Sequence, residues 1–171
     1  MLKLSGAFLG KQVLSLRTGR GVATITDAII NPDNLKIEGF YCTDTYDRSK
    51  LVLLYQDIRD LVPEGFIIDD HDVLCAPSDL VRLKTIMSIH YNPIGHVVKT
   101  VSKQTVGKVT DYAAELETLY IQKLYVAPRL LKSLTGGSLT VDRSQVCEIT
   151  DKAIIIDDLL DGGTVPITSP A

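Results

Sequence analysis

Short apolar runs alternate with turn-forming residues along most of this chain. The runs are rich in Val, Ile, Leu, Thr and Tyr, and turn residues such as the Asn-Pro-Asp-Asn at residues 31–34 separate them. A turn about every 8–12 residues is typical of a small β-barrel or sandwich. Proline fixes φ for a turn, and Asn and Asp tolerate the left-handed region, so residues 24–30 and 35–42 are predicted to form a hairpin. The pattern predicts a mainly β protein.

The same apolar blocks occur twice in the same order. The matching blocks are residues 9–13 and 94–98, 22–27 and 106–111, 35–42 and 119–126, 58–61 and 146–149, and 66–70 and 154–158. Because apolar positions fall on apolar positions throughout, we interpret the chain as two copies of one module. The predicted division is a first repeat at residues 1–77, a helical linker at 78–91, a second repeat at 92–160 and a flexible tail at 161–171.

One predicted strand changes phase along its length. Leu35 and Ile37 lie on one phase of the alternation, whereas Phe40 lies on the other. A strand with a period of two cannot place both sets on the same face without a bulge. We therefore expect a bulge near Gly39 and, in the second copy, near Lys123. Such kinks are needed to close a small barrel, so the phase change favours a barrel over a flat sheet.

The clearest helical pattern lies between the copies. Ser78 is a suitable N-cap, and apolar residues follow at positions 80, 83, 86 and 87. A short helix over residues 78–87 is therefore predicted to connect the copies and to pack them together.

Several blocks of the second copy resemble the PRC-barrel family. They are Ile-Gly-His-Val-Val at residues 94–98, Val-Gly-Lys-Val-Thr-Asp-Tyr at 106–112, and the strand at 119–126. This module is shared with the photosynthetic reaction centre H subunit and with the C-terminal domain of the ribosome-maturation factor RimM. The resemblance covers about residues 5–70 and 92–158. It implies two tandem small PRC-type β-barrels with a short connecting helix, which act in docking or assembly and carry no catalytic residues.

Charge and cysteine content narrow the expected class of protein. The formal charge of −3 gives no electrostatic reason to bind nucleic acid or an anionic membrane. The alternative is that a nucleic acid binds a local basic face on the second copy. Seven residues could form this face: Lys99, Lys103, Lys108, Lys123, Arg129, Lys132 and Arg143. No signal peptide or run of about 20 apolar residues is present, which predicts a soluble cytoplasmic protein. The resemblance to the PRC-barrel family implies a bacterial or archaeal source. Cys42, Cys75 and Cys147 stand among apolar neighbours, so buried reduced thiols are expected.

One short segment concentrates residues that can bind metal ions. It is Asp-Asp-His-Asp at residues 69–72, followed by Cys75. Carboxylates beside an imidazole could hold a divalent ion if a loop wrapped them around it. Alternate strand residues face opposite ways, however, and the second copy repeats the Asp pair at 157–158 without His or Cys. We interpret the segment as a solvated turn and predict no metal, no cofactor and no catalytic residue; a metal-binding or hydrolytic protein using Asp69 to His71 is a third hypothesis.

The tyrosines divide into two groups. Tyr41 and Tyr125 are repeat-equivalent, so their rings are expected to be buried with the hydroxyl at the rim. Five tyrosines have no counterpart in the other copy and are the candidates for partner contact: Tyr46, Tyr55, Tyr91, Tyr112 and Tyr120.

Taken together, these patterns predict a non-enzymatic adaptor or docking protein. Its partner is expected to be a protein, with no direct contact to nucleic acid and no membrane span. The partner's identity and the partner-binding residues are unassigned, and homo-oligomerisation is left open. The alternative is a RimM-like ribosome-associated factor that binds a ribosomal protein or rRNA.

Overall fold

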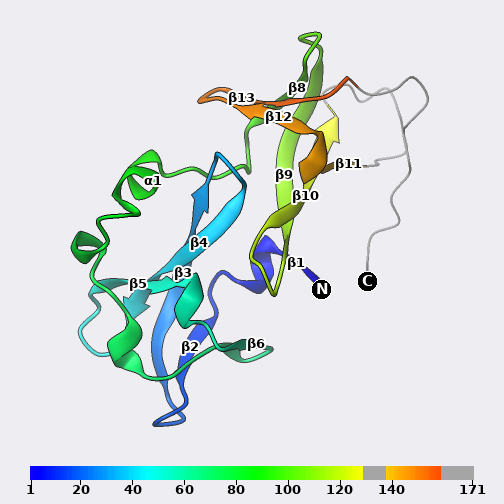
Figure 1. Ribbon diagram of the computed structural model, residues 1–171. Helices are drawn as coiled ribbons and strands as arrows, with labels where there is room; N and C mark the ends of the chain where they lie inside the picture. The colour runs from blue at the N-terminus through cyan, green and yellow to red at the C-terminus, as the bar shows by residue number, and fades with distance from the viewer. Residues whose placement is uncertain (129–137, 159–171) are drawn as a thin grey trace.

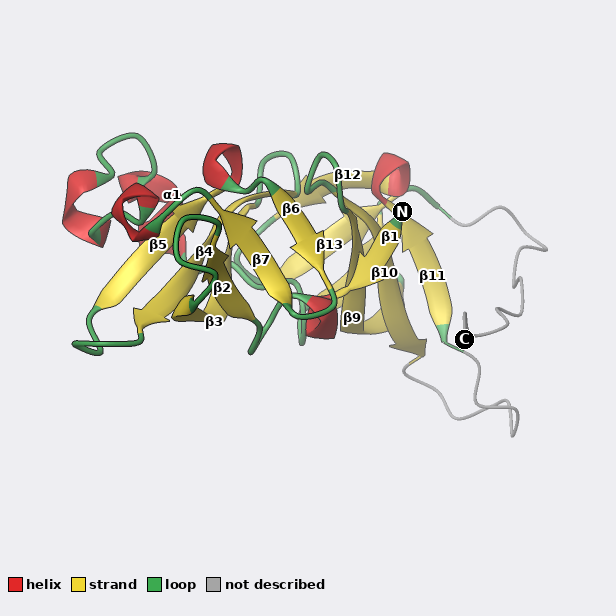
Figure 2. Cartoon of the chain, turned by 90° about the horizontal axis from the view of Figure 1, so that it is seen from below, coloured by secondary structure: helices red, strands yellow, loops and turns green. Residues whose placement is uncertain are grey.

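The strands form two sheets that lie side by side in the molecule (Figures 1 and 2). The computed structural model describes residues 1–128 and 138–158. Within these residues one α-helix, α1 (Lys84–Ile89), lies between the sheets in sequence. Short 3₁₀ helices cover Ser5–Ala7, Tyr55–Asp57, His71–Val73, Pro77–Asp79 and Arg143–Gln145. The prediction of a mainly β protein is confirmed.

The first sheet has six strands in the order β5-β4-β3-β2-β7-β6. Their bounds are β2 (Gln12–Ser15), β3 (Gly21–Asn31), β4 (Lys36–Asp44), β5 (Lys50–Leu54), β6 (Asp60–Val62) and β7 (Gly65–Ile68). β2 and β7 run parallel, and the other neighbours are antiparallel.

The second sheet repeats this order as β11-β10-β9-β8-β13-β12. Its strands are β8 (Val97–Thr100), β9 (Thr105–Glu115), β10 (Ile121–Pro128), β11 (Leu139–Asp142), β12 (Val146–Ile149) and β13 (Ala153–Ile156). β8 and β13 run parallel, as β2 and β7 do. A seventh strand, β1 (Leu2–Leu4), pairs with β9, although it lies in the sequence range expected for the first repeat.

The predicted hairpin and both predicted bulges are confirmed. β3 and β4 pair antiparallel, with Ile29 opposite Gly39 and Ile30 opposite Ile37, so Glu38 is the extra residue on β4. In the second sheet, the register shift skips Gln122 on β10. The extra residue therefore stands directly before Gly39 in one copy and before Lys123 in the other.

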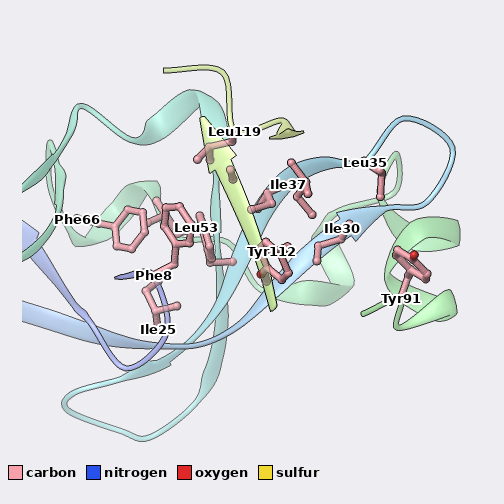
Figure 3. Close-up of a cluster of buried hydrophobic side chains, with 14 of the residues drawn as sticks. Phe8, Ile25, Ile30, Leu35, Ile37, Leu53, Phe66, Tyr91, Tyr112 and Leu119 are labelled. Carbon is pink, nitrogen blue, oxygen red and sulfur yellow. The ribbon is translucent and has the colours of Figure 1, made fainter. Parts of the chain in front are cut away.

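The prediction of two closed barrels is not borne out. The described strands form two open mixed sheets, and no described pairing joins β5 to β6 or β11 to β12. The sheets instead bury one continuous apolar cluster, which includes Phe66 and Ile37 from the first sheet (Figure 3). Tyr112 and Leu119 belong to the same cluster and come from the other half of the chain. The two halves therefore share one buried core.

The linker helix begins later than predicted. Ser78 lies inside the 3₁₀ helix Pro77–Asp79 and caps nothing, and α1 starts only at Lys84. Leu80 leaves the helical region, with φ −94° and ψ 72°, and packs on a cluster that contains Ile29. Packing against the sheet therefore overrides the local helical pattern. The predicted tail at residues 161–171 lies outside the described residues.

None of the described helices is long and apolar enough to cross a membrane.

Candidate docking groove at the junction of the two sheets

The two halves meet along a short antiparallel bridge that we call the seam, formed by residues 35–37 and 119–121. The Ile37 N–H donates to the Leu119 carbonyl at 2.9 Å, and the Ile121 N–H donates to the Leu35 carbonyl at 2.8 Å. These segments are repeat-equivalent at an offset of 84 residues. Each copy therefore binds the other through the same residues, which is the contact pattern of a two-fold symmetric dimer.

The chain enters both segments of the seam through the same kind of turn. Leu35 and Leu119 adopt left-handed backbone conformations, with φ 57° and 55°. Each donates its N–H four residues back, to Asn31 at 2.8 Å and to Glu115 at 2.8 Å. Bulky residues rarely adopt this conformation, so the surrounding contacts must hold it in place. Both leucines are buried in the shared cluster, and this burial holds the strained turns.

One cation–π contact lies beside each strand of the seam, and the cation and the ring exchange positions between the two copies. The Lys36 ammonium lies 4.6 Å from the centre of the Tyr55 ring, and the Arg143 guanidinium lies 4.6 Å from the centre of the Tyr120 ring. Lys36 corresponds to Tyr120 in the repeat, and Tyr55 corresponds to Arg143. The same pair of positions is thus kept in both copies, with the cation on opposite partners. Such contacts contribute about 0.5–1 kcal/mol at partly exposed sites.

The segment that precedes each copy contacts the sheet of the other copy. β1 pairs with β9, with Lys3 opposite Ala114, and the Ser5 hydroxyl donates to Asp111 at 2.6 Å. The repeat counterpart of β1 is the end of α1, which packs on Ile29 of β3. The leading segments, β1 for the first copy and α1 for the second, therefore each contact the sheet of the other copy.

A groove of about 500 Å³ lies where β6 meets the turn between β9 and β10. We call it the junction groove. Its apolar lining consists of Tyr55, Ile58, Leu61, Phe66, Leu116 and Leu119. Phe66 and Leu119 are buried, whereas the other four are half-buried. The Tyr55 hydroxyl donates to the Glu117 carbonyl at 2.7 Å and ties the two sides together.

Polar residues surround the apolar lining of the groove. Gln56, Arg59, Asp60 and Glu117 are exposed. Arg59 donates to both oxygens of Asp69, at 2.9 and 2.6 Å, and this contact lowers the pKa of the Asp69 carboxyl. Among the described residues, Asp60 and Glu117 form no ion pair. The rim therefore carries two carboxylates that no cation of residues 1–128 and 138–158 pairs with.

A second groove of about 530 Å³ lies on the linker side of Tyr55. It is lined by Leu54, Leu80 and Leu83, with Lys36 and Asp79 at its edges. Tyr55 and Gln56 line both grooves, so they form the ridge between them.

The side chains of residues 69–72, the segment interpreted as a solvated turn, contact different partners. Asp70 accepts from Ser15 at 2.9 Å and from Arg17 at 2.8 Å, whereas Asp69 is held by Arg59. The His71 imidazole contacts Asp44, and Asp72 is exposed. Within residues 1–128 and 138–158, no group of three or more His, Cys, Asp or Glu is placed to hold a metal ion. In the described fold this segment directly follows the end of β7.

The tyrosines do not follow the predicted division. Tyr91 and Tyr112, predicted to be partner-contact candidates, are buried in the shared cluster, and burial raises the pKa of both hydroxyls. Tyr55 and Tyr120 contact the opposite half of the same chain, Tyr55 through the Glu117 carbonyl and Tyr120 through Lys36, and Tyr46 is 70% exposed. Of the repeat-equivalent pair, Tyr41 is buried and Tyr125 is half-buried.

The cysteines are all free, but they differ in burial. Cys42 is buried, and this burial, with a smaller effect of Asp44, raises the pKa of its thiol to about 12. Cys75 is half-buried and Cys147 is exposed. The prediction of a buried thiol is therefore wrong for Cys147, because the short strand β12 lies at the edge of its sheet.

The described basic residues of the second copy have different surroundings. Lys123 pairs with Asp142, and Arg143 stacks on Tyr120. Lys99 and Lys108 line a separate hollow of about 630 Å³ on β8, β9 and β10. Arg129 and Lys132 lie outside the described residues.

Tyr55 is among the candidates for partner contact, but the other groove residues escaped the sequence analysis because they come from segments far apart in the chain. Ile58, Leu61 and Leu116 look like ordinary core positions, and only the seam brings them to one surface. The signal that points to the seam is the repeat itself, since Leu35 and Leu119 occupy equivalent positions. No protein-family model matches the chain, and no curated protein matches it in sequence.

Proposed function

We propose that this protein is a non-enzymatic docking protein that binds a partner protein in the junction groove. One observation carries the proposal: an apolar groove of about 500 Å³ crosses from the edge of the first sheet to the β9–β10 turn. Exposed apolar surface rimmed by polar residues is a common form of protein-binding site. The resemblance to the PRC-barrel family, whose modules serve docking and assembly, supports the same function.

The rigidity of the groove also supports this function. Its two sides are fixed to each other by the seam and by the hydrogen bond from Tyr55 to the Glu117 carbonyl. Phe66 and Leu119 are anchored in the shared cluster beneath it. A preformed surface loses little conformational entropy when it binds, so a modest apolar contact can give measurable affinity.

A substitution that fills the groove tests the proposal. Gln56 is exposed and lines the groove, so Gln56→Trp places an indole there without disturbing the buried cluster. Gln104 is also exposed but lies in the turn between β8 and β9, so Gln104→Trp is a matched control. Each form serves as bait in a lysate of the source cells, with and without nuclease treatment.

The expected result is one protein recovered by the unaltered chain and by Gln104→Trp, and lost with Gln56→Trp. Nuclease treatment should leave its recovery unchanged. Equal recovery by all three baits would contradict docking in this groove. Recovery of ribosomal subunits that nuclease abolishes would instead favour the RimM-like alternative.

A further inference from the structure

The chemistry of the groove and its edge also points to a particular kind of occupant, an inference that rests on the proposed docking function. We propose that the occupant is an extended apolar segment of the partner, flanked by Lys or Arg, which adds as a strand to the open edge of β6.

The backbone of β6 is available for such pairing. β6 is the last strand in the order of its sheet and pairs only with β7 among the described strands. The Leu61 N–H donates to the carboxylate of its neighbour Asp60 at 2.8 Å. Alternate residues of an antiparallel strand direct their N–H and C=O groups to opposite sides. Leu61 therefore presents its backbone at the open edge, where a partner strand can bond it by replacing the local hydrogen bond to Asp60.

The chain already contains one strand addition of this size. β1 adds to β9 through three residue pairs, with the apolar Leu2 and Leu4 on either side of Lys3. β6 is also three residues long. The edge of β6 is thus long enough to pair with a segment as short as β1.

Side chains on one face of an added strand would enter the groove. Successive residues of a strand point to opposite faces, so every second side chain of the occupant faces the groove lining. That lining consists of Ile58 and Leu61 at the wall and Phe66 and Leu119 beneath. Apolar side chains at alternate positions fit this surface.

The charges at the rim select the flanking residues of the occupant. The cations at the groove are already paired, Arg59 with Asp69 and the Met1 ammonium with Glu115. Asp60 and Glu117 have no cationic partner among the described residues. Lys or Arg beside the apolar residues would neutralise them, whereas Asp or Glu there would be repelled.

Three capped peptides test the inference by titration into the full-length, ¹⁵N-labelled chain. The probe is acetyl-Lys-Leu-Thr-Leu-Lys-amide. The second peptide has Glu in place of both Lys, and the third is the probe with an N-methyl group on each Leu. In antiparallel addition the residue opposite Leu61 faces the groove as Leu61 does, so the Leu N–H groups are those that pair with the β6 edge. The methyl groups remove these N–H groups and leave the side chains unchanged. Asp60→Lys with Glu117→Lys is the matched protein variant, since both residues are exposed.

The probe should shift the amide signals of Gln56, Leu61 and Leu116, and the N-methylated peptide should bind at least tenfold more weakly. In the Asp60→Lys, Glu117→Lys variant the preference should reverse to the Glu peptide. Equal affinity of the methylated and unmethylated peptides would overturn strand addition and leave docking in the groove standing. An absence of groove shifts with every peptide would overturn the inference, whereas the Gln56→Trp experiment decides the docking function separately.

Discussion

Asp44 is a buried carboxylate that holds together the end of β4 and the segment after β7. It is 3% exposed and accepts hydrogen bonds from the N–H groups of Tyr46 at 2.7 Å and Asp47 at 3.2 Å. The His71 imidazole contacts it as well. Burial alone would raise the pKa of Asp44, but these hydrogen bonds outweigh burial and lower it. The charged form is therefore the one that stabilises the fold.

Removing this charge should destabilise the protein in a pH-dependent way. Asp44→Asn is expected to lower the free energy of unfolding by about 1–3 kcal/mol at neutral pH, because buried donors lose a charged acceptor. The native carboxyl has a lowered pKa, so its contribution is complete above the unfolded value of about 3.9 and is lost as the pH falls through the folded value. Urea unfolding from pH 7 to pH 3 should show the difference between the two proteins shrinking below about pH 4. The exposed Asp72→Asn is the control, and a difference that stays constant over this range would contradict the account.

Gly107 allows β9 and β10 to approach closely. A Cβ at this position would lie 1.9 Å from the Ala127 carbonyl oxygen, whereas a Cβ on Gly6 would meet nothing within 4 Å. Gly107→Ala should therefore lower the free energy of unfolding by about 1–3 kcal/mol, and Gly6→Ala should leave it nearly unchanged. Chemical denaturation of both variants measures the difference. Equal stability of the two would show that the strands can separate without cost.

The helix α1 is the least secured element of the described fold. None of its residues is buried, no side chain caps its start, and it ends at His90 in a left-handed conformation with φ 50°. Three of its six residues, Thr85, Ile86 and Ile89, are β-branched and lower its helix propensity. Its counterpart in the first copy is the strand β1, so the two copies differ in conformation at this position.

Amide hydrogen exchange should separate α1 from the seam. Elements with few buried contacts open locally, at a free-energy cost far below that of global unfolding. The amides of Met87 and His90 are therefore expected to exchange through such local opening. Those of Ile37 and Ile121, which form the seam bonds, should exchange only through global unfolding. Seam amides that exchange as fast as those of α1 would contradict this difference.

Local patterns could be predicted from the sequence, whereas contacts between distant segments could not. The β3–β4 hairpin and the bulges beside Gly39 and Lys123 follow from alternation and turn chemistry within a few residues. The open sheets and their shared cluster do not, because that cluster joins segments from both halves of the chain. The junction groove escaped for the same reason. It exists only where Leu61 and Leu116, 55 residues apart in the chain, are brought together by the seam.

The molecule as a whole is held together by what the two copies share. One buried cluster runs through both sheets, the seam joins equivalent residues, and each leading segment covers the opposite sheet. Unfolding of either half would expose the part of this cluster that it shares with the other half. The two copies should therefore unfold together, in contrast to two independent domains joined by a linker.

The most direct measurement is denaturant unfolding monitored separately in each half. The chain has no Trp, so Tyr41→Trp and Tyr125→Trp place a single fluorescent probe at repeat-equivalent positions of the first and second sheets. One cooperative unit predicts the same midpoint and the same denaturant dependence from each probe and from the circular dichroism of the same variant. Within either variant, a fluorescence transition that ends while part of the β-sheet circular dichroism persists would show that the halves fold independently, and would contradict the shared core and seam as the basis of the fold.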